Sequence, residues 1–295
     1  MITALDQLES EAIDILREGV ANAENPVLLF SGGKDSTVLA HLALRAFYPA
    51  KPPLTLLHVD STWEFADVLA FRDRFAAEHG FRLVVHANEE ARARGINPFD
   101  HGAEYTYLMR TLALRQALDK GGYDVIFGGA RRDEEAVRAK ERIVSVRDAN
   151  HGWDPRNQRP ELWRNFNWRK SPGQSLRVYP ISNWTEQDLW SWISLRNIPL
   201  CPLYFSAPRP VLNRGGVQLV IDDPDRMRWA DGDKVETPAV RFRTLGCWPV
   251  TGAIDSDATG LSEVIRETFS SRYSERQGRI SDGASLEAVK REGYF

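Results

Sequence analysis

The segment Ser31–Ser36 (SGGKDS) has the residue types of a phosphate-binding loop. It follows the apolar run Val27–Phe30, which predicts a buried strand, and precedes Thr37–Phe47, whose apolar residues have helical spacing. Gly32 and Gly33 let the backbone turn tightly and expose its amides, and the start of a helix adds a positive end. The loop is therefore predicted to bind an anion. It differs from the mononucleotide loop GxxxxGK[ST] because an aspartate follows its lysine, and an ordinary glycine-rich turn is the alternative.

The polar side chains of this loop suggest how a phosphate would be held. Lys34 is a compact positive charge able to meet a phosphate oxygen, and Ser31 and Ser36 can donate hydroxyls to the same group. Asp35 can bind Mg²⁺, brace the loop or act in catalysis, and it is equally suited to a helix N-cap. We expect Lys34 and Asp35 to lie on an exposed loop.

A second candidate residue follows the apolar run Leu54–Val59, which predicts another buried strand. Asp60 comes directly after this run and would face the same crevice, where it could contact a ribose or a metal ion. An aspartate that simply forms a turn is the alternative.

The third strand end is the richest in charge. The predicted strand Tyr123–Phe127 is followed by Gly128 and Gly129, which let a phosphate approach the backbone, and then by Arg131 and Arg132. We expect both arginines to bind an anion, with about 1.5–3 kcal/mol from each charge-assisted hydrogen bond.

Four other arginines are further anion candidates. Arg138 and Arg142 are four residues apart and share one face of a predicted helix. A solvated face with an ion pair between Glu134 and Arg138 is the alternative. Arg241 and Arg243 alternate along a predicted strand, so they share a face that suits a second anion, an acidic partner or plain exposure to solvent.

The elements that must position these residues alternate along the chain. Strands are predicted at residues 27–30, 54–59, 81–86 and 123–127, with a candidate fifth at 177–179, and helices at 5–20, 37–47, 64–79 and 105–120. This alternation predicts an α/β fold with a doubly wound, mainly parallel sheet. Ligands of such a sheet bind beyond the carboxyl ends of the strands, where the strand order reverses.

The rest of the chain has a less regular pattern. Residues 88–103 are predicted to be a loop, and residues 147–175 an irregular segment. Thr185 and Asp188 predict a capping box at the start of a helix. Beyond residue 200, a hairpin turning at 213–216 and a helix at 261–271 predict a smaller α+β extension. We therefore divide the chain into domains at 1–200 and 201–295.

The composition argues against several classes of protein. The chain has 295 residues, 42% of them hydrophobic, and a net charge of −3, so it has no overall bias toward nucleic acid. Cys201 and Cys247 form no CxxC pair, which speaks against a disulfide framework or a metal cluster. No histidine follows His151, so Cys247 is expected to be structural. Without a signal-peptide core or a membrane-length apolar run, a cytoplasmic location with no membrane partner is expected.

Longer motifs resemble one family. SGGKDS is similar to the pyrophosphate loop of the ATP pyrophosphatases. FGGARRDEEAVRAKERI, WDPRNQRPELW, YPISNWTEQDLW, VRFRTLGCWPVTGA and KREGYF resemble the small, nucleotidyl-transferring subunit of bacterial ATP sulfurylase (sulfate adenylyltransferase subunit 2). The resemblance covers nearly the whole chain and implies an adenine nucleotide alpha hydrolase-like fold. It also implies transfer of AMP from ATP to sulfate, a need for Mg²⁺, and a larger GTPase subunit that binds GTP.

The resemblance implies roles for the charged candidates. Lys34 and its loop would hold the leaving pyrophosphate, and Arg131 and Arg132 would screen the repulsion between the α-phosphate and sulfate. Asp35 and Asp60 are the candidate Mg²⁺ ligands.

Two further expectations concern the base and the partner. The backbone of Phe30 and Val59 is expected to pair with the adenine edge, as strand-end backbone does in nucleotide-binding sheets. Residues 151–174, which contain several tryptophans and arginines, and residues 274–279 (SERQGR) are candidate docking surfaces for the partner.

The chain departs from the family's pattern at residues 145–148, which read SVRD where the family often has SFRD, and in FNWRKSPGQS and AEYTYLMR. A specialised paralogue is therefore an alternative. A sulfonucleotide reductase is another, although the C-terminal ECG-type cysteine motif that it needs is absent. A non-catalytic, nucleotide-sensing subunit is a third.

Overall fold

The computed structural model describes residues 2–270, and within them six strands form one sheet in the order β3-β2-β1-β4-β6-β5. The strands are β1 (Pro26–Leu29), β2 (Thr55–Val59), β3 (Arg82–His86), β4 (Val125–Phe127), β5 (Val144–Arg147) and β6 (Ser175–Val178). Neighbours are parallel except for β5, which pairs antiparallel with β6. The predicted α/β fold with a mainly parallel sheet is confirmed.

The strand order reverses at β1. The chain first builds β2 and β3 on one side of β1, and then crosses to the other side to build β4. The order therefore reverses between β1 and β4, and sheets of this kind bind their ligands at the carboxyl ends of the strands at such a point.

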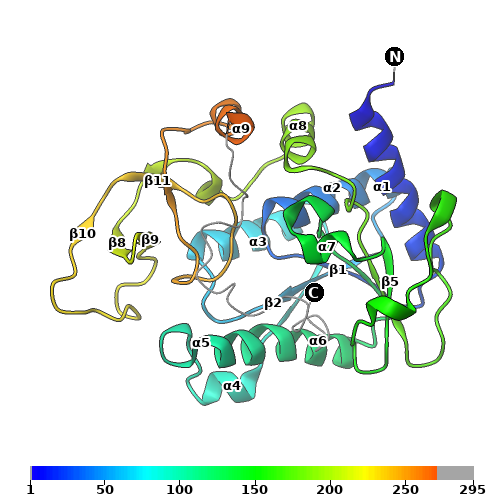
Figure 1. Cartoon of the computed structure of the whole chain (residues 1–295), viewed down its shortest axis with the longest axis horizontal. Coiled ribbons are helices and arrows are strands. Elements are labelled where there is room, and N and C mark those ends of the chain that lie inside the picture. Colours follow the sequence, from blue (N-terminus) through cyan, green and yellow to red (C-terminus); the bar gives the residue numbers. More distant parts are fainter. Residues whose placement is uncertain (1, 271–295) are drawn as a thin grey trace.

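Helices cover both faces of the sheet. The helices α1 (Ala4–Ala21), α2 (Lys34–Phe47) and α3 (Ala66–Glu78) lie on one face and α6 (Ala113–Gly121) on the other (Figure 1). Successive side chains of β1 point to opposite faces of the sheet, so Leu28 packs in the apolar cluster on one face and Val27 in the cluster on the other. The sheet is thus doubly wound, as predicted.

The helix α8 (Glu186–Arg196) packs against α2 and begins with the predicted capping box. The Thr185 Oγ1 accepts from the Asp188 N–H at 3.0 Å, and the Asp188 carboxylate accepts from the Thr185 N–H at 2.9 Å.

The segment 88–103 is helical, so the prediction of a loop is wrong. It forms α4 (Glu89–Ala93) and α5 (Pro98–Thr106), and the π-helical turn η1 (Tyr107–Leu112) joins α5 to α6. Asn88 and Asn97 cap the two helices with their side-chain oxygens, and a proline occupies the first turn of α5. These residues are mostly polar, so in the sequence the two N-cap asparagines are interpreted as part of a loop rather than as the starts of helices.

The segment after β4 also differs from the prediction. The helix α7 (Ala136–Ala139) has only four residues, and the chain then enters the edge strand β5. Arg138 and Arg142 therefore do not share a helical face, because Arg142 lies beyond the end of α7. At the start of β5, the backbone N–H groups of Ile143 and Val144 donate to the Glu161 carboxylate, both at 2.8 Å, and so the chain is extended here rather than helical.

Beyond residue 200 the described chain forms two small antiparallel sheets, ordered β10-β8-β9 and β12-β11-β7. Their strands are β7 (Ala207–Pro208), β8 (Val211–Arg214), β9 (Val217–Val220), β10 (Val235–Glu236), β11 (Ala239–Arg241) and β12 (Ile254–Asp255), and α9 (Leu261–Ser270) follows. Short 3-10 turns complete the described elements: η2 (Arg132–Glu134), η3 (Pro155–Asn157), η4 (Leu162–Arg164) and η5 (Pro202–Tyr204). The predicted hairpin, β8-β9, and the last helix are both present.

This C-terminal part packs directly on the parallel-sheet part. The ring of Phe242 lies 4.9 Å from that of Phe65, and Trp248 lies 5.0 Å from Trp63. A division of the chain near residue 200 stays a prediction. None of the helices within residues 2–270 is both long and apolar enough to cross a membrane.

Candidate active site

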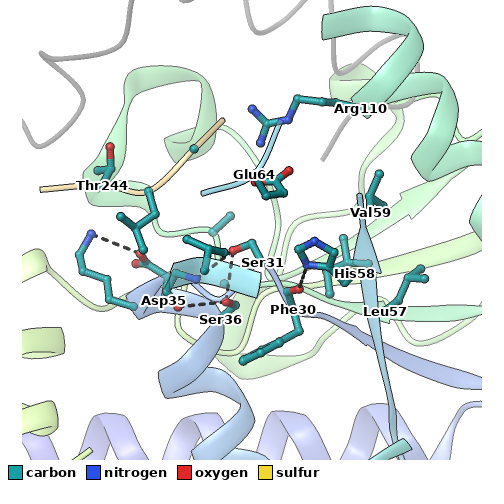
Figure 2. Close-up of a pocket in the computed structure, with 18 of the residues that line it drawn as sticks. Phe30, Ser31, Asp35, Ser36, Leu57, His58, Val59, Glu64, Arg110 and Thr244 are labelled. Atoms are coloured by element: carbon teal, nitrogen blue, oxygen red, sulfur yellow. Dashed lines mark hydrogen bonds and ion pairs between the residues drawn. The ribbon is translucent and has the colours of Figure 1, made fainter. Parts of the chain in front are cut away.

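A cavity opens at the carboxyl ends of β1, β2 and β4, where the strand order reverses. The predicted site residues that line it are Phe30, Ser31, Gly33, Lys34, Asp35, Ser36, Val59, Gly129 and Arg138. In Figure 2 the loop residues Ser31, Asp35 and Ser36 lie to the left of His58 and Val59, so strands β1 and β2 supply adjacent walls.

The loop after β1 is fixed by its glycines and hydroxyls. Gly32 has φ 75°, and a Cβ there would lie 3.1 Å from Val68 Cγ1, so only glycine fits without strain. The hydroxyls of Ser36 and Thr37 donate to the Gly33 carbonyl at 3.0 and 2.9 Å. These bonds hold the N-terminal end of α2 beside the cavity, where its dipole favours an anion.

Lys34, Asp35 and Arg131 form a chain of alternating charge. The Asp35 carboxylate lies 2.6 Å from Arg131 Nε and 3.3 Å from Lys34 Nζ. Lys34 is 1% exposed and the Asp35 side chain 25%, so the expectation that both lie on an exposed loop is wrong for Lys34. Arg131 is completely buried. Burial by itself would raise the pKa of Asp35, but Lys34 and Arg131 outweigh it and hold this pKa well below its ordinary value. Asp35 is therefore an ionised brace between two cations.

Gly129 brings the β4 loop against the β1 loop. A Cβ at this position would lie 3.0 Å from the carbonyl carbon of Asp35. The glycine is thus required for backbone contact between the two loops, and this contact places Arg131 within reach of Asp35.

Three of the predicted arginines do not line the cavity, although they follow β4. Arg131 lies beneath the loop and holds Asp35. Arg132 donates its Nη1 to Asn183 and its N–H to the Ser182 carbonyl. Arg142 donates to the Arg159 carbonyl at 3.1 Å. The sequence correctly predicts that these arginines follow a strand, but each side chain bonds to a residue distant in the sequence and so does not line the cavity.

Arg241 and Arg243 also lie apart from the cavity wall and are held by acidic residues. Arg241 is buried on Glu267, with its Nε 2.8 Å from Oε2, and Arg243 donates to Glu186 at 3.2 Å. Acidic residues of this chain therefore occupy the positions that we expected a second anion to take.

The predicted pair of metal ligands does not come together. Asp60 does not line the cavity, and its Oδ1 accepts from the Thr62 N–H at 2.7 Å, which is the turn geometry weighed as the alternative. No cluster of three or more His, Cys, Asp or Glu side chains within residues 2–270 is arranged to hold a metal ion. These residues do not fit a metal ion held by the protein alone.

Several lining residues are not among the predicted site residues, although the segment 244–246 lies in the motif VRFRTLGCWPVTGA and Arg110 in AEYTYLMR. Tyr204, in η5, accepts from the Lys34 N–H at 2.8 Å, and Glu64, before α3, accepts from Ser61 Oγ at 2.6 Å. Arg110 on η1 and the segment 244–246 complete the wall. Tyr204, Glu64 and Arg110 carried no local signal, because only the tertiary fold brings them to the loop.

The backbone of Phe30 is already engaged. Its N–H donates to the Leu57 carbonyl at 2.9 Å, and its carbonyl accepts from His58 Nδ1 at 2.9 Å. Figure 2 shows the second contact as a dashed line. The Phe30 N–H is therefore engaged, but the Phe30 carbonyl has a second lone pair, so the expected pairing of this backbone with adenine stays a prediction. Val59 lines the cavity as expected.

Both cysteines are buried in environments that keep them as thiols. Cys247 Sγ lies 2.9 Å from Ser61 Oγ, and burial followed by the Glu64 charge raises the pKa of its thiol. Burial raises the pKa of Cys201 to about 12. Neither is an activated nucleophile, which disfavours the reductase alternative.

The tryptophans of the segment 151–174 are in different environments. Trp153 is buried, Trp163 is 95% exposed, and Trp168 donates to Glu18 at 2.7 Å. The docking role of this segment stays a prediction. The second candidate docking surface, residues 274–279, lies outside the described residues.

Comparison with known proteins defines the class. The phosphoadenosine phosphosulfate reductase domain family matches residues 25–253, and the chain belongs to this family. The structure of the FMN adenylyltransferase of Candida glabrata in complex with FAD and inorganic pyrophosphate aligns with a TM-score of 0.52 at 16% identity, over 99% of this chain and 84% of that chain. This likeness supports the α/β fold alone.

Within that class, full-length relatives define the particular family. Sulfate adenylyltransferase subunit 2 of Chelativorans sp. (strain BNC1) is 57% identical over 298 residues, which covers 100% of this chain and 99% of the relative. The protein of the same name from Caulobacter vibrioides is 58% identical, covering 100% and 96%. The chain belongs to the sulfate adenylyltransferase subunit 2 family.

Proposed function

We propose that this chain binds ATP in the cavity and transfers its AMP group to sulfate, giving adenylyl sulfate and pyrophosphate. The observation that carries the proposal is the convergence of the loop Ser31–Ser36, the start of α2 and Gly129 on one cavity at the reversal of strand order. Relatives 57% identical over the whole chain are named for this reaction, which supports sulfate as the acceptor.

The reaction needs positioning more than acid–base chemistry. A sulfate oxygen attacks the α-phosphorus and forms a new P–O bond, while the bond to the bridging oxygen of pyrophosphate breaks and its electron pair leaves with pyrophosphate. Sulfate is already deprotonated at neutral pH, so no general base is required. The protein must hold two anions in line and offset their repulsion.

Three cations of the cavity wall suit this task. Lys34 and the start of α2 are placed for the pyrophosphate, and Arg138 and Arg110 lie on other walls. Arg138 is held in place by Glu135 at 2.8 Å and Glu134 at 3.3 Å, the second of which is the ion pair weighed as an alternative. We assign Arg131 to positioning Asp35 rather than to direct contact with sulfate.

Magnesium enters this proposal as part of the substrate. Mg²⁺ at phosphate sites keeps several waters and binds mainly to the phosphates, with one or two carboxylates. MgATP meets this description without the Asp35–Asp60 pair, and no step is assigned to a metal held by the protein.

The partner is proposed to be a GTPase. The relatives are named as second subunits, so they belong to heteromeric enzymes. Adenylyl sulfate is a high-energy anhydride, and this chain has no GxxxxGK[ST] loop to hold a second nucleotide. We propose that a larger subunit with bound GTP supplies the missing free energy.

Exchange of labelled pyrophosphate into ATP tests the proposal. With the partner present, exchange should depend on sulfate and should fall at least about 100-fold in Lys34→Ala, since a charge-assisted contact to the leaving group is lost. Lys140→Ala is the matched control, because Lys140 is exposed and does not line the cavity. Exchange that is independent of sulfate, or equal loss in both variants, contradicts the proposal.

A further inference from the structure

His58 lines the cavity but has no part in the chemistry described above. It is the fourth residue of β2, between Leu57 and Val59, and only 2% of it is exposed. Its Nδ1 is 2.9 Å from the Phe30 carbonyl, whereas its buried Nε2 has no hydrogen-bond partner among the described residues. A buried polar atom without a partner is unusual in a folded protein and is costly unless a ligand completes it.

The contact with Phe30 determines which nitrogen carries the proton. A carbonyl oxygen only accepts, so Nδ1 must be the donor. Burial, the largest influence, lowers the pKa of His58 below its ordinary value, so the ring is neutral at pH 7 and Nε2 carries a lone pair. The unpartnered atom is therefore an acceptor. Its ligand must offer an N–H or O–H group, which phosphate esters and sulfate do not have at neutral pH.

The surroundings of His58 suit a planar base rather than a phosphate. Apolar side chains from four elements line the same cavity: Leu29, Leu57, Val59, Val68 and Leu114. The carboxylate of Glu64 lines it as well and acts electrostatically on the His58 ring. The charges that act on the ring are of both signs, Glu64 and Asp60 against Arg72, so it is the apolar wall of the cavity that favours a planar base over a phosphate. The phosphates have their own place at the loop after β1.

We propose that His58 Nε2 accepts a hydrogen bond from the exocyclic amino group of adenine and so selects ATP against nucleotides with a 6-oxo group. This inference rests on the proposed function, because it requires ATP in the cavity. It gives the adenine amino group a side-chain acceptor, a role that the Phe30 N–H, which is a donor and is engaged by the Leu57 carbonyl, does not fill. Guanine and hypoxanthine place a carbonyl oxygen where adenine has its amino group, so two lone pairs would face each other. A chain whose proposed partner binds GTP requires such selection.

Nucleotide binding to the full-length chain, measured by calorimetry, tests the proposal. The wild-type chain should bind ATP about 10- to 100-fold more tightly than inosine triphosphate, the range expected for one unsatisfied buried acceptor. Purine riboside triphosphate, which has neither the amino group nor the oxygen, should fall between the two. The same measurements with 2′-deoxy-ATP and 3′-deoxy-ATP test whether a ribose hydroxyl is the donor instead.

Two substitutions separate recognition from folding. His58→Asn keeps a donor near the Nδ1 position for the Phe30 carbonyl but has no acceptor near Nε2, so the ratio of ATP to inosine triphosphate affinity should fall below about threefold. His58→Gln places an amide near Nε2 that can accept from adenine or donate to a 6-oxo group, so it should gain affinity for inosine triphosphate. His86→Asn, at the end of the neighbouring strand β3 and outside the cavity wall, should keep the wild-type ratio.

The outcomes are distinct. An unchanged ratio in folded His58→Asn that still exchanges pyrophosphate contradicts the role of His58 while leaving the proposed function standing. A loss of affinity for either deoxy-ATP that disappears in His58→Asn assigns Nε2 to the ribose and also overturns the proposal. Absence of ATP binding and of exchange in the wild-type complex would instead reject the proposed function itself.

Discussion

Asp35 provides the sharpest test of how the site is held together. Its carboxylate lies 2.6 Å from Arg131 Nε and 3.3 Å from Lys34 Nζ, and Arg131 is completely buried. Asp35→Asn keeps the shape but removes the charge. The contact of Arg131 with Asp133 is a weaker substitute, because it is 3.7 Å long and Asp133 is half-exposed.

The expected loss can be estimated from these contacts. Removing one partner of a buried ion pair costs about 3–5 kcal/mol. Asp35 is 25% exposed and the new amide can still accept from Arg131, so we expect the lower end, about 3 kcal/mol of unfolding free energy. Turnover should fall as well, because Lys34 loses the group that orients it.

Urea unfolding followed by tryptophan fluorescence measures the free-energy change. Asp133→Asn is the matched control and should cost less than about 1 kcal/mol, since its contact with Arg131 is long and half-exposed. A second check is the pair Asp35→Asn with Arg131→Met, which should be less destabilised than the sum of the single changes. A change below about 0.5 kcal/mol for Asp35→Asn, or strict additivity of the pair, would refute the brace.

Three further predictions follow from individual contacts. Gly129→Ala should push the β4 loop away from Asp35, because the added Cβ would lie 3.0 Å from the backbone of Asp35. The change should lower the free energy of unfolding by about 1–3 kcal/mol and remove much of the turnover. Wild-type rates of pyrophosphate exchange would contradict this close fit. Cys247→Ser should keep adenylyl transfer within about twofold, because its buried thiol contacts Ser61 and does not line the cavity; complete loss would revive the reductase alternative. Burial and the neighbouring His79 lower the pKa of His41 to about 4. The wild-type chain should therefore become less stable as the pH falls from 6.5 to 4, because the unfolded state takes up the proton first. His41→Leu should remove about 2 kcal/mol of this dependence, and an unchanged pH profile of urea midpoints would contradict it.

The sequence predicts those parts of the site that depend on local geometry. The loop Ser31–Ser36 and Gly129 follow short apolar strands, and their backbone conformations are encoded by nearby glycines. Parallel strands carry their carboxyl ends to one edge, so the positions of these segments follow from the fold class alone. The reaction, transfer of AMP from ATP to sulfate, is predicted from the resemblance to the family and not from the residues alone.

The remaining features depend on tertiary partners that a single sequence does not reveal. Asp60 forms a turn with Thr62, and Arg132 is drawn to Asn183, which is 51 residues away. Conversely, Tyr204 reaches the loop from 170 residues further along the chain. A side chain at a strand end has several partners within reach, and the pattern of residue types does not choose among them.

Formation of labelled adenylyl sulfate from radiolabelled sulfate and ATP tests the central claim most directly. The chain assembled with its GTPase partner should form the product in amounts that rise strongly with GTP, and the isolated chain should form little. Lys34→Ala should abolish the product under the same conditions. Strong accumulation by the isolated chain without GTP would contradict the proposed partner, and absence of labelled adenylyl sulfate from the complete assembly with ATP and GTP would contradict sulfate adenylyl transfer itself.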